Sequence, residues 1–151
     1  MTVEITINNF QSHLIDRAFL KDAIRLTLEK HNKSDIDITL QLTDNETIRQ
    51  LNQAYRGINK LTDVLAFNQE FLNPETGRLY LGDVIISIEQ AQKQAQENNV
   101  TLNKECALLT IHGTLHLLGY DHSEEQEKQQ MWSMQDTIMR DLLLSREEEL
   151  E

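Results

Sequence analysis

The chain is 151 residues long, carries a formal net charge of −11 and contains a single cysteine. This length suits one domain with a core that needs no crosslinks, and a lone cysteine excludes an intramolecular disulfide framework. The sequence has neither an apolar run of membrane-spanning length nor a signal-peptide pattern, so we expect an unexported, cytoplasmic protein with Cys106 packed in its core.

The acidic residues concentrate at the C-terminal end. Residues 121–151 carry ten acidic side chains against three basic ones. We predict that the acidic tail at about residues 146–151 is solvated and frayed. Because the rest of the chain is only mildly acidic, the net charge does not exclude a nucleic-acid partner.

Strand and helix periodicities alternate through the first third of the chain. Alternating apolar residues predict a strand over residues 2–8, and apolar residues spaced by three and four predict an amphipathic helix over 12–31. Alternation returns over residues 36–42. Thr43 followed by Glu46 is a capping-box pattern, which predicts that a helix starts there.

The middle of the chain predicts a β-hairpin. Residues 63–67 and 79–87 are strand-like, and the turn-forming segment NPETG lies between them. A second capping-box pattern at residues 87–90 predicts a helix that ends near residue 98. The hairpin would therefore lead directly into a helix.

The remaining residues predict two more helices. Residues 102–118 are mostly apolar, which indicates a central helix buried on several sides. A capping-box pattern at residues 123–126 predicts a last helix that ends near Leu144. Together the patterns predict a single α+β domain over residues 1–151, with a mixed sheet of about four strands and about five helices.

Three of the five histidines lie in the segment HGTLHLLGYDH, residues 112–122. His112 and His116 are four residues apart, so a helix places both rings on one face, where their nitrogens can converge on an ion. A pair of this kind also occurs in cores that bind no metal. Gly119 favours a left-handed helix end that returns the chain, and His122 follows it as a third candidate ligand. Three neutral nitrogen ligands predict one Zn²⁺ ion with an open catalytic position.

The same spacing occurs in metzincin proteases as HExxHxxGxxH, but this chain has Gly113 where those enzymes carry the glutamate that acts as general base. The metal could still assist hydrolysis of a phosphodiester. Asp63 and Asp83 are candidates for the missing base, although aspartates at strand ends also satisfy backbone donors. Asp121 could orient an imidazole or cap the next helix.

HGTLHLLGYDH, together with YRGINKLTDVLAFN and LGDVIIS, resembles the YbeY family of bacterial endoribonucleases over nearly the whole chain. The resemblance implies a single-strand-specific endoribonuclease in rRNA maturation, at the 3′ end of 16S rRNA, and in ribosome quality control. It also implies that His112, His116 and His122 bind a metal, usually zinc, and that Arg56 acts near it. The chain departs from the common TDVLSFP pattern at Ala66 and Asn68.

Several other residues are candidates for contact with RNA. Arg56 can present a planar fork to a phosphate, or it can complement the dipole at a helix end. Lys60 can assist it, and Tyr120 is expected to line the cleft. The basic side chains Arg17, Lys21 and Arg25 form a stripe that could follow an RNA backbone, or simply a solvated helix face.

These observations predict a zinc-dependent endoribonuclease that acts on rRNA of the small ribosomal subunit, with either metal-bound water or a ribose 2′-hydroxyl as nucleophile. Two alternatives stay open. One is a metal-dependent hydrolase of another substrate, such as a peptidase whose base comes from elsewhere. The other is a ribosome assembly factor with a structural zinc. The sequence does not indicate an oligomeric state.

Overall fold

The computed structural model describes residues 1–8, 10–60, 62–121 and 123–150, with side chains up to residue 146 in the last helix. Within these residues it contains four strands and five α-helices, which confirms the predicted α+β class. In chain order the elements are β1 (Thr2–Ile7), a short 3₁₀ helix (Ser12–Leu14), α1 (Arg17–Glu29), β2 (Ile36–Thr43), α2 (Asn45–Arg56), β3 (Val64–Leu72), β4 (Leu79–Ser87), α3 (Ile88–Asn98), α4 (Leu102–Leu117) and α5 (Glu125–Leu150).

The four strands form one mixed sheet in the order β1-β2-β4-β3. β1, β2 and β4 are parallel, and β3 pairs antiparallel with β4, so the predicted hairpin is confirmed. β3 continues to Leu72, beyond the predicted end at residue 67. The outer half of this edge strand is exposed on both faces, and a register shift interrupts it between Asn68 and Phe71. This half therefore has no alternation of apolar and polar residues from which the sequence could predict a strand.

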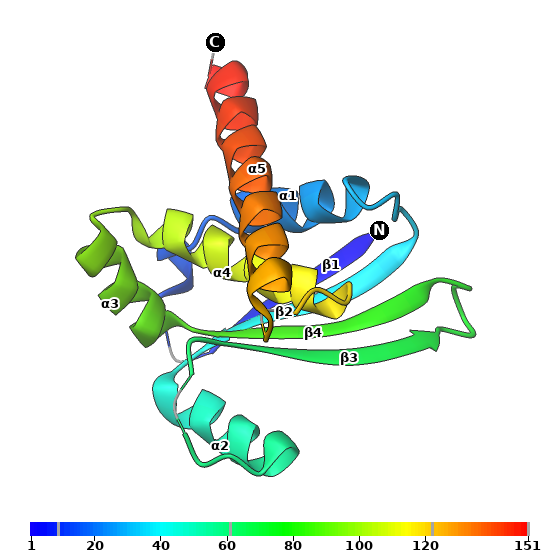
Figure 1. Ribbon diagram of the computed structural model, residues 1–151, viewed down its shortest axis with the longest axis horizontal. Helices are drawn as coiled ribbons and strands as arrows, with labels where there is room; N and C mark the ends of the chain where they lie inside the picture. Colours follow the sequence, from blue (N-terminus) through cyan, green and yellow to red (C-terminus); the bar gives the residue numbers. More distant parts are fainter. Residues whose placement is uncertain (9, 61, 122, 151) are drawn as a thin grey trace.

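The helices cover the two faces of the sheet unequally (Figure 1). α1, α3, α4 and α5 lie on one face, and α2 lies on the other. α4 is the central helix of the larger layer, because it contacts α1, α3 and α5 as well as β3 and β4. Its side chains Ile111 and Leu115 are fully buried in the main core. The predicted central position of this helix is confirmed.

A second, much smaller core holds α2 against the opposite face. It consists of Ile48 from α2, Leu65 from β3 and Ile85 from β4, with Leu51 and Phe67 packed against them. This cluster covers only part of the face, so the rest of the sheet beside α2 is open.

Two helices begin later than the sequence patterns predict. α1 begins at Arg17, because the side chain of Asp16 caps it and the preceding residues form the separate 3₁₀ turn. α2 is capped by Asp44 instead of Thr43, with a hydrogen bond of 2.7 Å from the Thr47 backbone N–H to Asp44 Oδ1. In both cases the helix begins after an aspartate that lies beyond the predicted start and caps the first turn.

The last helix departs from its predicted bounds at both ends. α5 begins at Glu125 instead of directly after Ser123, whose hydroxyl donates to Asp121 over 2.9 Å. It then continues to Leu150, beyond Leu144, because glutamate, arginine and leucine favour helix even where the apolar periodicity has ended. Fraying of residues 146–151 stays a prediction.

The remaining expectations from composition concern the core thiol and the membrane. Cys106 is fully buried in α4, and burial raises the pKa of its thiol to about 12, so the group stays protonated and acts in packing. Among the described residues, no helix combines the length and apolar character that a bilayer span requires.

Glu105, in the first turn of α4, yields a prediction about stability. Its side chain is buried, and this burial is the main cause that raises the carboxyl pKa above the ordinary value of 4.5; the nearby charge of Asp63 acts in the same direction. The protonated Glu105 carboxyl therefore makes its full contribution to the stability of the folded state below pH 4.5. This contribution is lost as the pH rises through the folded-state pKa. We expect Glu105→Gln to raise the melting temperature at pH 7 and to have little effect at pH 4.

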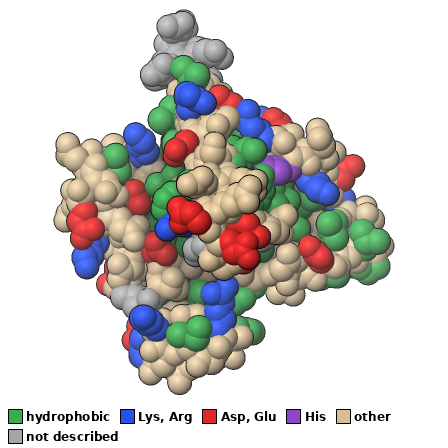
Figure 2. Space-filling model, in the orientation of Figure 1, with side chains coloured by type: hydrophobic (Ala, Val, Ile, Leu, Met, Phe, Trp, Pro, Cys, Tyr) green, Lys and Arg blue, Asp and Glu red, His purple; other side chains and the backbone are tan. Residues whose placement is uncertain are grey.

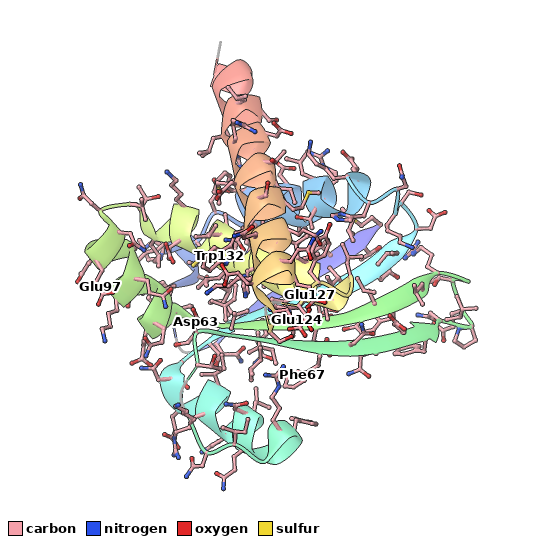
Figure 3. All side chains as sticks on the ribbon, viewed as in Figure 1. Asp63, Phe67, Glu97, Glu124, Glu127 and Trp132 are labelled. Carbon is pink, nitrogen blue, oxygen red and sulfur yellow. The ribbon has the colours of Figure 1, made fainter. Side chains whose placement is uncertain are left out.

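Melting curves between pH 4 and pH 8 test this expectation. Glu97→Gln is the matched control, because Glu97 is exposed on α3 (Figure 3). Equal responses of the two variants at every pH would show that burial of Glu105 carries no cost.

Candidate metal centre and its cleft

His112 and His116 lie on successive turns of α4 with their rings side by side. The Nε2 atoms of the two rings are 3.2 Å apart, and the ring centroids are 4.7 Å apart with an interplanar angle of 75°. Both side chains are half-buried. The two nitrogens therefore face one another at the edge of the core instead of pointing in separate directions.

Gln135 of α5 determines which nitrogen of His112 carries the proton. Its Oε1 atom lies 2.9 Å from His112 Nδ1. Because a carbonyl oxygen only accepts, Nδ1 donates, and the neutral ring then carries its lone pair on Nε2, which faces His116. This is the arrangement of a metal-binding histidine with an outer hydrogen-bond partner. The sequence patterns did not identify Gln135, because it is far from the histidine motif and is brought there only by the crossing of α5 over α4.

The two imidazoles fit a zinc ion. Two nitrogens held at about 2.0–2.1 Å from a tetrahedral zinc are about 3.3 Å apart, close to the spacing found here. The third predicted ligand, His122, lies outside the described residues. Within the residues that are described, no group of three His, Cys, Asp or Glu side chains is placed to hold an ion. Zinc binding by three histidines therefore stays a prediction.

The turn after α4 returns the chain toward the two histidines. The backbone N–H of Gly119 donates to the carbonyl of His116, and that of Tyr120 donates to the carbonyl of Leu115, both over 3.0 Å. These two bonds form a Schellman motif, which requires the left-handed conformation that Gly119 adopts at φ 104°. Asp121, two residues further on, lines the same cavity as His112 and His116.

This cavity has a volume of about 440 Å³ and brings together distant parts of the chain. Around the two histidines it is lined by Asp121 from the turn, by Asp63 directly before β3, and by Arg56 from the end of α2. Figure 3 shows Asp63 beside the start of β3, near α3, and its Oδ2 atom accepts from Gln94 over 3.1 Å. The pattern-based candidates Arg56, Asp63 and Asp121 thus share one cavity.

Arg56 stands at the mouth of the cavity. It is the last residue of α2, where Gly57 ends the helix in the left-handed conformation at φ 69°. The side chain is exposed, and its guanidinium makes no ion pair with any residue that the structure describes. Its charge is therefore available to an anion that enters the cavity.

Other candidates lie elsewhere. Lys60 is exposed and is not among the residues that line the cavity. Tyr120 does not line it either, contrary to the expectation that it borders the cleft; its hydroxyl lies 2.8 Å from Nε2 of His31. His31 in turn donates from Nδ1 to the carbonyl of Thr27 over 2.7 Å, so Tyr120 anchors the turn after α4 to the end of α1.

Asp83 and the basic stripe are also separate from this cavity. Asp83 accepts hydrogen bonds from Tyr80 and Gln69 on the opposite face of the sheet. In the stripe, Arg17 donates to a backbone carbonyl of β1, and Arg25 pairs with two acidic neighbours on its own helix. These contacts favour the interpretation of the stripe as a solvated helix face.

The glycine that follows His112 is required by packing. A Cβ atom on Gly113 would lie 2.5 Å from Cγ1 of Val84 and 3.3 Å from Cγ2 of Val64. α4 lies so close to β3 and β4 at this point that a glutamate, as in the metzincins, would have to displace the helix from the sheet. The absence of that general base is thus built into the packing of α4.

Comparison with known proteins gives the same assignment as the motif. The family model described as Endoribonuclease YbeY matches residues 5–143. The chain belongs to the YbeY endoribonuclease family. It is 46% identical over 125 residues to the Endoribonuclease YbeY of a Sulfurihydrogenibium species, covering 82% of each chain. It is 38% identical over 151 residues to that of Desulforamulus reducens, covering 94% of this chain and 99% of the relative.

The fold is also found in a solved structure. The solution structure of TM1509 from Thermotoga maritima superimposes with a TM-score of 0.66 at 26% sequence identity, covering 98% of this chain and 93% of the other. The α+β architecture described above is therefore shared with a protein whose sequence has diverged considerably.

The contact between Gln135 and His112 predicts an effect on metal affinity. Replacing Gln135 with leucine removes the acceptor that holds the His112 ring, so we expect zinc to bind about 10- to 100-fold more weakly, as is typical for loss of an outer partner. Competition with a chromophoric chelator measures the affinity. The control is Gln129→Leu, an exposed glutamine on the same helix. Equal affinities of the two variants would contradict the assigned role.

The close approach at Gly113 predicts a loss of stability. Gly113→Ala should destabilise the protein by roughly 1–3 kcal/mol through overpacking, reduced by about 1 kcal/mol of gained helix propensity. Urea unfolding measures the change. If contact with Val84 is the cause, the loss should shrink when Gly113→Ala is made in a Val84→Ala background. A loss of the same size in both backgrounds would rule out this contact.

Proposed function

We propose that this protein is a zinc-dependent, single-strand-specific endoribonuclease of the cytoplasm, which acts in maturation of the 3′ end of 16S rRNA and in ribosome quality control. The main supporting observation is the facing pair of imidazole nitrogens, 3.2 Å apart, in a cavity that also holds an arginine without an ion pair among the described residues. Membership of the YbeY endoribonuclease family supports the nuclease activity and the rRNA substrate.

In this proposal His112, His116 and His122 hold one zinc ion. When bound, the ion supplies Lewis-acid chemistry that polarises a phosphoryl oxygen. Gln135 fixes the His112 tautomer, and the Schellman turn at Gly119 places Asp121 in the cavity with the pair. Asp121, which also lines the cavity, would hydrogen-bond to an imidazole and orient it.

Arg56 would bind the phosphate group that is cleaved. Its planar fork can form two parallel hydrogen bonds to phosphate oxygens and stabilise the negative charge that develops there. Lys60 would add positive charge on the exposed loop that follows α2. Tyr120 is not included among the substrate contacts, because its hydroxyl is bonded to His31.

Asp63 would accept a proton from the attacking nucleophile. Its Oδ2 atom is held by Gln94, which leaves Oδ1 as the candidate proton acceptor in the cavity. Because Asp63 and Asp121 place two carboxylates beside the histidines, an RNA phosphate would be repelled without a cation. Arg56 and the metal would together compensate for this repulsion.

The proposal is tested by metal analysis combined with RNA and peptide cleavage assays. We expect wild-type protein to bind zinc and cleave single-stranded RNA, and His116→Ala to lose both. Arg56→Ala should keep its zinc and cleave RNA on the order of 10²-fold more slowly, as when a donor to a developing negative charge is removed. Arg140→Ala, which removes an exposed arginine on α5, is the charge-matched control.

The alternatives give different results in the same assays. Zinc binding without cleavage of either substrate would favour an assembly factor with a structural metal. Peptide cleavage that depends on His116 would favour a peptidase, although the packing at Gly113 leaves no room for the metzincin base. Chelation followed by re-addition of zinc should abolish and restore RNA cleavage if the proposal is correct.

A further inference from the structure

A second hollow lies on the opposite face of the sheet, between α2 and the β3–β4 hairpin. We call it the α2 groove. It has a volume of about 700 Å³, and the residues that matter here are Gln41, Tyr55, Arg56, Phe67, Gln69 and Asp83. Among the described residues, Figure 1 shows α2 as the only helix on this side of the sheet, and Figure 3 shows Phe67 on the side of β3 that faces α2.

The α2 groove is continuous with the metal cavity. Arg56 and Ala66 line both. Ala66 lies on β3, which is the edge strand of the sheet, so the two hollows meet around this edge. A flexible chain that places a phosphate at Arg56 can therefore pass from one hollow to the other across a small side chain.

The wall of the groove presents an aromatic surface to solvent. Tyr55, next to Arg56 in the sequence, is 70% exposed, and its ring centroid lies 5.2 Å from that of Phe67 at an interplanar angle of 51°. Phe67 is packed against the small core under α2, so it supports the tyrosine from below. An exposed ring held in this way suits stacking on a planar ligand.

The polar groups of the groove suit nucleobases better than phosphates. Its floor carries the carboxylate of Asp83 and the amides of Gln41 and Gln69. The Asp83 carboxylate repels phosphate, and it orients the Gln69 amide, whose Nε2 donates to it. The amide oxygens of Gln41 and Gln69 can accept hydrogen bonds from base N–H groups. Among the described lining residues, Arg56 is the sole cation, and it lies at the boundary with the metal cavity.

The distribution of charge favours an approach from the α2 side. Figure 2 shows acidic side chains over the N-terminal part of α5, where Figure 3 labels Glu124 and Glu127, and basic side chains over α2. A polyanion is repelled by the first surface, and on the second it is attracted mainly by the exposed Arg56, since Arg49 of α2 is paired with Glu46.

We propose that the α2 groove binds the nucleobases next to the scissile phosphate of a single-stranded RNA, with one base stacked on Tyr55. This inference rests on the proposed function and extends it, because it assigns a binding subsite on the opposite face of the sheet from the histidines. Tyr55 and Arg56 then divide recognition between them: the ring holds a base, and the guanidinium holds the adjoining phosphate.

The test compares Tyr55→Ala, Tyr55→Leu and Tyr55→Phe with wild type, all loaded with zinc. Steady-state cleavage of a short single-stranded RNA gives KM and kcat, and fluorescence anisotropy gives Kd independently. Tyr55→Ala and Tyr55→Leu should raise KM and Kd on the order of 10-fold, with kcat and zinc content nearly unchanged, since they remove one stacked base. Tyr55→Phe keeps the ring and should bind like wild type.

Two comparisons make the test specific. Trp132→Ala removes an aromatic ring that is 49% exposed from α5 on the other side of the sheet, and should leave KM unchanged. RNAs with one abasic nucleotide, placed in turn at each position around the cleavage site, should bind more weakly to wild type at one position. At that position Tyr55→Ala should cause no further loss, because both changes remove the same contact.

The outcomes separate the two proposals. Unchanged KM and Kd in Tyr55→Ala, or losses that add at every abasic position, would overturn the groove assignment while the nuclease activity stands. If wild type binds but does not cleave RNA, the proposed function fails, but Kd still tests the groove assignment. Weaker RNA binding by Tyr55→Ala and Tyr55→Leu then supports the groove assignment, and binding equal to wild type overturns it. Tyr55→Leu removes the ring but preserves apolar bulk and helix propensity. It therefore still tests the stacking contact if Tyr55→Ala has a folding defect.

Discussion

The close packing of α4 on β3 and β4 is the constraint on which the candidate site depends. Gly113 lets the helix approach until only a hydrogen fits between its backbone and Val84. The two neighbouring histidine positions are thereby held against the edge of the sheet, half-buried and facing one another. A helix lifted from the sheet by a larger side chain would carry the imidazoles away from Asp63 and Arg56, which belong to other elements.

The other helices orient the His112 ring and hold the turn that follows α4. α5 crosses above it and supplies Gln135, which orients the His112 ring. The turn after α4 is held by its Schellman bonds and by the contact of Tyr120 with His31 at the end of α1. Among the described residues, α4, α5 and the end of α1 thus each contribute a separate contact to the His112 ring or to the turn after α4.

The asymmetric covering of the sheet explains why two hollows meet at one arginine. Four helices bury one face, whereas α2 covers only part of the other through the small cluster around Ile48. Because β3 is the edge strand, no further strand of the described part of the chain separates the two faces beyond it. Arg56, at the end of α2, stands where both faces are accessible, so one cation can serve the metal cavity and the open groove together.

The sequence by itself determined the features that depend on local periodicity: the helix that carries His112 and His116, the left-handed Gly119, the hairpin and the α+β class. It did not determine the contacts between elements. Whether an aspartate reaches the histidines depends on the strand order and on which face each strand residue occupies, and so Asp63 lines the cavity while Asp83 lies on the opposite face. The contacts of Gln135 with His112 and of Tyr120 with His31 likewise depend on how the helices pack. Hydrogen bonds between residues far apart in the chain leave no periodic signal, because only the packing of whole helices brings their atoms together.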